Sequence, residues 1–203
     1  MKQFKKMTLW SVALVLVIVT NSHAAPAQYQ CYNFDDLVAG KEYTVGDVID
    51  TEHATITIKP YFTNGTPATA TVRHAESAPA NIAGGTAPEL SLYLVSLNVV
   101  PHQPVTRIKT LLAQNISQTG DFADANIEVN GEKHESPRGF AQMNGKSIGK
   151  PGKGRAKIRA TVLPTSANWH AGTLEVRAKP GEAIESFTLG GHTWRVDDMC
   201  FGL

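Results

Sequence analysis

The sequence predicts an all-β fold: an antiparallel two-sheet β-sandwich of jelly-roll type, closed by one disulfide. Short apolar–polar alternations with a period of two recur along the chain, and clusters of Gly, Pro, Asn and Asp separate them. Only two cysteines occur, Cys31 and Cys200, one near each end of the expected domain. Roughly ten short strands with frequent turns favour a sandwich among the all-β folds.

The expected strands follow one another closely. Residues 55–58 and 68–72 alternate cleanly, with a turn signal between them at residues 64–67. Residues 90–94 alternate and the phase then shifts over residues 95–98, which predicts a β-bulge. A strand is expected over residues 105–112; residues 105–115 also suit a helix by composition, but we favour the strand. Asn130 and Gly131 predict a hairpin turn after a strand at residues 125–129. The remaining expected strands are residues 156–163, 172–178, 184–189 and 193–201.

Residues 1–24 are predicted to be a secretory signal peptide. Three lysines precede an apolar run over residues 7–20, and Ser22, His23 and Ala24 match a small-x-small cleavage site. The run is shorter than the ~20 residues that a membrane-spanning helix needs, although an uncleaved anchor is the alternative. We expect residues 25–203 to form one domain in the periplasm, at the cell surface or outside the cell, with no integral membrane segment after cleavage.

The charge balance and the cysteines limit the function classes. The signal removes three of the 19 basic residues and no acid, so 16 basic residues face 18 acidic ones. A nearly neutral chain offers no argument for nucleic-acid binding, and we expect none. Two cysteines in an exported chain predict a disulfide, with two separately buried thiols as the alternative.

Three segments of the chain carry a recognisable pattern, and its residues are Cys31, Phe34, Asp35, Leu37, Gly40, Tyr43, Val45, Gly46 and Asp47, then Gly84, Gly85, Glu89 and Leu90, and finally Phe187, Gly190, Gly191, Trp194, Asp197, Asp198 and Cys200. This pattern resembles that of a family of exported, mostly uncharacterised bacterial β-sandwich domains. The resemblance implies a fold similar to carbohydrate-binding modules and no particular reaction. His192 departs from the pattern, since Gln is usual at that position.

Aspartates at the two ends are candidate ligands of a structural calcium ion. Strand alternation places Trp194, Asp198 and Cys200 on one face, so Asp198 is expected to point inward if Cys200 does. A buried carboxylate needs hydrogen bonds or a cation, and calcium prefers oxygen ligands. The alternative is a pair of solvated carboxylates that cap turns or bridge to Arg195. The candidate ligands are Asp35, Asp36, Asp197 and Asp198.

Histidines offer a second kind of metal site. His170 and His192 each adjoin a tryptophan, and imidazoles that meet across strands can bind copper or zinc. No spacing of histidines in the chain matches a zinc motif, so surface or hydrogen-bonded histidines are the alternative.

A basic, glycine-rich loop and a few aromatic residues are the candidate ligand-binding features. No acid occurs between residues 136 and 174, and a loop near residues 145–155 offers Lys150, Lys153 and Arg155 to anionic groups. A merely solvated loop is the alternative. Trp169, in a polar turn, and Tyr61 are the candidates for stacking on a sugar ring.

These observations favour an exported, non-catalytic binding protein. The expected partner is a saccharide or an anionic cell-surface polymer. One alternative is a copper- or zinc-binding protein that uses histidines, and another is a surface or matrix interaction protein that uses the basic loop. Catalysis is not favoured, because the two cysteines are expected to pair, which excludes a cysteine nucleophile, and adjacent carboxylates in a strand point in opposite directions.

Overall fold

The structure is a computed structural model that describes residues 28–63, 66–67, 74–78, 82–86, 88–115, 125–136, 139–150, 154–166 and 168–203. The predicted signal peptide, the strand expected at residues 68–72 and Lys153 lie outside these residues. The described part of the chain contains no α-helix, and therefore no helix that could cross a bilayer. The all-β prediction is confirmed.

Strands of very different lengths make up the fold, together with one turn of 3₁₀-helix, η1 (Phe140–Met143). The strands are β1 (Tyr29–Tyr32), β2 (Glu42–Tyr43), β3 (Val48–Asp50), β4 (Ala54–Pro60), β5 (Phe62–Thr63), β6 (Thr66–Pro67), β7 (His74–Ala78), β8 (Glu89–Pro101), β9 (Arg107–Asn115), β10 (Ala125–Val129), β11 (Glu132–Ser136), β12 (Ser147–Ile148), β13 (Ala156–Ser166), β14 (Trp169–Ala178) and β15 (Phe187–Gly202).

The long C-terminal strand β15 organises the sheet. One edge of β15 pairs with β8 and then, over its last four residues, with β1. The other edge pairs first with β10 and then with β9. All four pairings are antiparallel. Strands from the two ends and the middle of the chain therefore meet on one strand.

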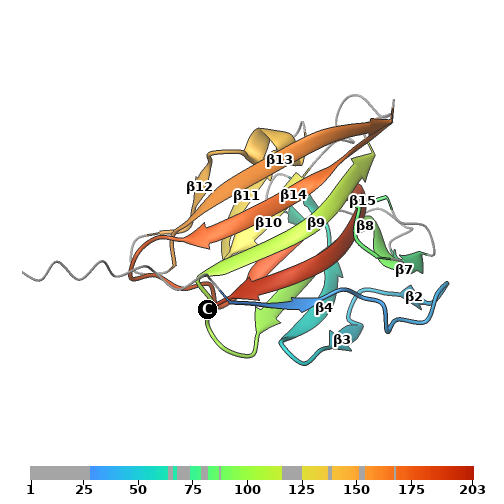
Figure 1. The fold of residues 1–203 in the computed structure, drawn as a ribbon, viewed down its shortest axis with the longest axis horizontal. Coiled ribbons are helices and arrows are strands. Elements are labelled where there is room, and N and C mark those ends of the chain that lie inside the picture. The colour runs from blue at the N-terminus through green and yellow to red at the C-terminus, as the bar shows by residue number, and fades with distance from the viewer. Residues whose placement is uncertain are drawn as a thin grey trace, which may run out of the picture.

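The sheet folds over on itself. Hydrogen bonds join 13 strands into one continuous sheet, whose main path runs β12, β13, β14, β9, β15, β8, β4, β3. Figure 1 shows β13, β14 and β9 in front of β10, β11 and β4. Apolar side chains from both layers form one buried cluster between them, and η1 contributes Phe140 and Met143. This arrangement is sandwich-like, but two separate sheets with jelly-roll topology are not confirmed.

The predicted irregularity in β8 is present. Leu94 has a left-handed backbone (φ 54°), and the buried positions shift from Leu90 and Leu92 to Val95, Leu97 and Val99. At this point the partner of β8 changes from β7 to β4. The phase shift in the sequence therefore marks the place where β8 passes from one neighbour to the next.

Other expectations hold with two changes. Residues 107–115 are strand rather than helix, and Asn130 and Gly131 form the β10–β11 turn with positive φ angles of 49° and 82°. The two strands expected at residues 184–189 and 193–201 are largely one strand, β15, which runs through Gly190 and Gly191. Part of the loop expected near residues 145–155 is also strand, since β12 pairs with β13.

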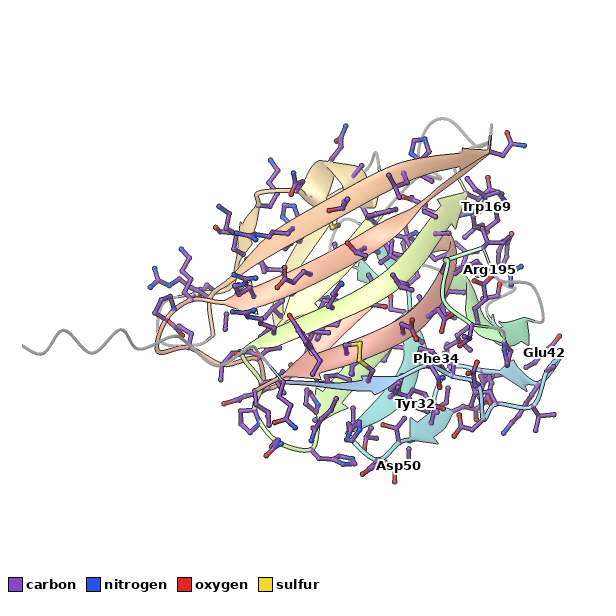
Figure 2. The ribbon with its side chains drawn as sticks, viewed as in Figure 1. Tyr32, Phe34, Glu42, Asp50, Trp169 and Arg195 are labelled. Atoms are coloured by element: carbon purple, nitrogen blue, oxygen red, sulfur yellow. A yellow bond between two sulfur atoms is a disulfide. The ribbon has the colours of Figure 1, made fainter. Side chains whose placement is uncertain are left out.

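The disulfide joins the two ends of the domain as predicted. Cys31 of β1 lies directly opposite Cys200 of β15, and the two are bonded (Figure 2, yellow). The predicted orientation of Asp198 and Cys200, on the same face as Trp194, is wrong, however. The pairing with β9 shifts register between Asp197 and Cys200, and Asp198 has a φ of 41°. Because of this bulge, Met199 rather than Cys200 continues the buried face of Trp194, and Cys31 is exposed.

We expect the disulfide to stabilise the fold mainly through chain entropy, because it links residues 169 positions apart. Replacing both cysteines by alanine should lower the free energy of unfolding by about 2–5 kcal/mol. Urea denaturation monitored by tryptophan fluorescence measures this change. Reductant should destabilise the native protein and leave the double variant unaffected. Equal urea midpoints for the two proteins without reductant would contradict the prediction.

Candidate functional site

The outer face of β13, β14 and β9 presents side chains to solvent in register. Inward positions of these strands, such as Ile158, Val176 and Ile108, are buried in the core. The residues between them point outward, because successive side chains of a strand alternate between faces. The strand pairing then fixes which outward residues are neighbours.

Two outward rows are strongly basic. The first row runs Lys157, Arg177, Arg107 across β13, β14 and β9, and the second runs Arg159, Glu175, Lys109. We call the five cations of these rows the basic face. Adjacent strands are about 4.8 Å apart, and rows two residues apart are separated by about 6.7 Å. The cations therefore form a compact array on a rigid sheet.

Only one carboxylate, that of Glu175, lies within these rows, and it is already paired with an arginine. Glu175 accepts hydrogen bonds from Arg177 Nη2 at 2.8 Å and Nε at 3.3 Å. In the described part of the chain, neither Lys109 nor Arg159, on either side of Glu175, forms an ion pair within 4.0 Å. Lys109, Lys157 and Arg159 are exposed. The basic face therefore carries excess positive charge that is open to solvent.

Acidic residues gather elsewhere. Residues 31–52 contain six carboxylates and one lysine, Lys41, and all six acids are exposed. These residues form β1 to β3 and their connections, at the edge away from β12 and β13 in Figure 1. The nearly neutral total therefore conceals two surfaces of opposite charge. The six acids are Asp35, Asp36, Glu42, Asp47, Asp50 and Glu52.

The cations expected to bind from the loop are paired instead. Lys150 Nζ lies 2.7 Å from Glu132 Oε1, and Arg155 Nε lies 3.6 Å from Glu182 Oε1. Lys153 is not among the described residues. The sequence predicted a binding site for anions in the loop, and it did not predict the basic face. The missed signal was the alternation of cations at Lys157 and Arg159 within an expected strand.

The candidate aromatic residues are less accessible than expected. Tyr61 is buried, with 4% of its surface exposed, so it offers no face to a sugar. Trp169 is partly buried at the start of β14 (Figure 2), where it packs against a small cluster that includes Ala83, Ala113 and Ala171. Of the two, only Trp169 retains a partly open surface, and it lies on the same outward side as the basic face.

The four aspartates separate into different environments. Asp36 accepts a 2.6 Å hydrogen bond from the Tyr32 hydroxyl, and Asp35 lies 2.9 Å from the Thr86 hydroxyl. Asp197, rather than Asp198, is fully buried: it lies on the outward side of β15, opposite Leu111 of β9, and Gly85 packs against its carboxylate. Asp197 Oδ1 accepts the Asp198 N–H at 2.8 Å, whereas Asp197 Oδ2 has no hydrogen-bond partner.

A short segment, residues 82–86, covers Asp197 and the buried Glu89. Glu89 Oε2 accepts hydrogen bonds from the backbone N–H groups of Ile82 and Ala83 at 2.9 and 2.8 Å. Gly85 lies so close to Asp197 that a Cβ there would stand 2.2 Å from Asp197 Oδ2. A side chain at position 85 would therefore displace the Asp197 carboxylate. Glu89 Oε1 faces Arg195 Nε at 3.6 Å.

The environment of Asp197 favours its neutral form. Burial raises the pKa of Asp197 to about 7, and the nearby carboxylates of Asp198, Glu89 and Asp35 act in the same direction. The hydrogen bond from the Asp198 N–H opposes this shift. Burial also raises the pKa of Glu89, against the effect of its two backbone hydrogen bonds and of Arg195. The cluster therefore holds less negative charge than its composition suggests.

No metal site is assembled among the described residues: no three His, Cys, Asp or Glu side chains are arranged to hold an ion. His170 is in β14, and His192 is in β15 with its ring against Tyr93 at a centroid distance of 5.4 Å. The structural calcium stays a prediction. Of its four candidate ligands, Asp197 fits best, because its buried Oδ2 lacks a partner, and Asp36 fits least.

Comparison of the chain with models of protein families, with curated proteins and with solved structures finds no match.

We expect Asp197 to make the metal-free protein less stable as the pH rises. The folded state holds this proton up to about pH 7, whereas the unfolded state releases it near its ordinary pKa of 3.8. The folded state thus binds more protons between these values, and stability falls as pH increases through this window. From pH 5 to pH 8 the loss should be on the order of 2 kcal/mol greater than in Asp197→Asn.

Urea denaturation in the presence of a chelator, at both pH values, measures the difference. Glu42→Gln, at an exposed carboxylate, is the matched control and should behave as the native protein. A native protein and an Asp197→Asn variant with the same pH dependence would contradict the prediction. Calcium that restores stability at pH 8 in the native protein alone would indicate that a cation can replace the proton.

Proposed function

We propose that this chain is an exported, non-catalytic binding protein and that its ligand is an anionic polysaccharide held on the basic face. The observation that carries the proposal is the alignment of five cations in two rows across β13, β14 and β9, with Glu175 as their only acidic neighbour in the rows. Guanidinium groups bind carboxylate and sulfate in a bidentate manner, and lysine adds positive charge.

The shape and spacing of the basic face suit a repeating polymer. A sheet face is wide and open, so it can lie along a chain rather than enclose a small molecule. Its cations repeat at roughly 5–7 Å in two directions, on the scale of single sugar units. The acidic surface formed by residues 31–52 repels a polyanion, so the charge distribution steers the polymer toward the basic face.

The compartment favours a glycan over a nucleic acid. The Cys31–Cys200 disulfide suits an oxidising environment, and the N-terminal sequence predicts export. Surface polymers that carry uronate or sulfate groups are the abundant polyanions there. At the other end of the same outward face, Leu163 and Trp169 add apolar surface that can contact the C–H faces of sugar rings.

No reaction is part of the proposal. The rows contain one carboxylate, Glu175, and Arg177 engages it, so it is poorly placed to act as an acid or base. The face also presents no cysteine thiol, since both cysteines of the chain are bonded to each other.

We expect the native protein to bind alginate or heparin and to ignore neutral dextran. The double variant Lys109→Gln, Arg159→Gln should bind about ten- to thirtyfold more weakly, since each cation near an anionic surface contributes roughly 1 kcal/mol. Raising the salt concentration from 50 to 300 mM should also weaken binding, because it screens exposed charges. Affinity electrophoresis or isothermal titration measures both effects.

The matched control is Lys41→Gln, Lys59→Gln, which removes the same charge from exposed lysines outside the basic face. It should bind as the native protein does. Equal losses in the two double variants would contradict a localised site. Binding of double-stranded DNA as tight as that of the preferred polysaccharide would contradict the choice of a glycan.

A further inference from the structure

Two histidines from different turns line one pocket at an end of the sheet. His53 belongs to the β3–β4 turn, and His102 directly follows β8. The pocket has a volume of about 270 Å³, and Glu52, Gln30 and Gln103 also line it. A backbone hydrogen bond from the His102 N–H to the His53 carbonyl, 2.9 Å long, fixes the two turns against each other.

The ring of His102 is held in one orientation. Its Nδ1 lies 3.1 Å from the Glu52 carbonyl oxygen. A carbonyl oxygen only accepts, so Nδ1 carries the proton and donates it. Histidines that bind metals typically make such a bond with one nitrogen, and it fixes the ring so that the other nitrogen can coordinate. This bond leaves Nε2 as the nitrogen that can coordinate, and it lies 3.6 Å from Asp50 Oδ1 and 3.5 Å from the Thr55 hydroxyl.

Each imidazole also has a carboxylate beside it. Glu52 Oε2 lies 3.9 Å from His53 Nε2, and Asp50 Oδ1 lies 3.6 Å from His102 Nε2. Two ligands bound to one tetrahedral zinc at about 2.0–2.2 Å are about 3.4 Å apart. Both nitrogen–oxygen pairs are near that separation. Thr55 donates to Asp50 Oδ1 at 3.0 Å, so Glu52 is the less engaged of the two carboxylates.

We propose that His53 and His102 bind a divalent transition-metal ion, Zn²⁺ or Cu²⁺, with the Glu52 carboxylate as third ligand and solvent completing the coordination. Imidazole suits both ions. The three groups do not converge on one point as they stand, but the Glu52 side chain is 89% exposed and can turn into the pocket. The backbone hydrogen bond between His102 and His53 holds the two turns together, and binding requires the exposed Glu52 side chain to turn toward the histidines. Asp50, the last residue of β3 (Figure 2), lies 3.6 Å from His102 Nε2, and its charge adds to the attraction for a cation.

Titration of tag-free protein with zinc chloride and with copper chloride tests the site. We expect one ion per chain, with a dissociation constant of 10 µM or below. Affinity should fall at least 100-fold in His53→Ala, His102→Ala and about tenfold or more in Glu52→Gln. The electron paramagnetic resonance spectrum of the Cu²⁺-loaded native protein should show coupling to two imidazole nitrogens, and the double variant should lose it.

His170→Gln is the matched control, because it removes another partly buried histidine far along the sheet; it should retain full affinity. Thermal melting establishes that each variant folds, and His53→Gln, His102→Gln replaces the alanine pair if that pair does not. Failure of the native protein to bind either ion below 100 µM would overturn the proposal. Unchanged affinity in a folded double variant would do so too. Neither outcome bears on binding at the basic face.

Discussion

The fold depends on the pairing of β15 with four other strands. β8 and β10 flank its first half, and β9 and β1 flank its second half, so one strand belongs to both layers. This requires close approach at its centre. Gly190 lies opposite Ser96 of β8, and a Cβ at position 190 would stand 2.7 Å from the Ser96 Cα. Because this Cα belongs to the backbone, rotation of a side chain cannot relieve the clash. The glycine lets β15 remain one strand where the sequence suggested two. The disulfide then secures the end of β15 to the first strand of the described chain.

Because β15 is covered on both sides near its end, polar groups are buried there. Asp197 and Glu89 are both fully buried, and residues 82–86 close over them through the hydrogen bonds that Glu89 accepts. A buried carboxylate is costly as an anion, which explains why burial raises the pKa values of both groups. A proton or a cation at Asp197 offsets this cost. The two features have different causes: residues 82–86 bury Asp197, whereas the bulge that follows Asp197 turns the disulfide to the outside.

Charge separation is the property that links the fold to the proposed ligand. Cations cluster on the outward rows of β13, β14 and β9, while acids cluster over residues 31–52. Neither cluster is neutralised by the other, because the fold places them on different strands. The loop cations Lys150 and Arg155, by contrast, are paired with glutamates and stabilise local structure. His53 and His102 line a separate pocket, close to the carboxylates of Glu52 and Asp50, and this negative charge favours a cation over an anion.

The sequence by itself determined the all-β class, most strand positions, the irregularity at Leu94, the hairpin at Asn130 and the disulfide, because these follow from local alternation, turn residues and the presence of two cysteines. Tertiary structure alone decided which side chains meet. The bulge between Asp197 and Cys200 reversed the facing expected from alternation, since one extra residue changes a period of two. The basic face joins Lys109 to Arg159, and the pocket joins His53 to His102. Both pairs are about 50 positions apart in the chain, and only the register between strands brings them together.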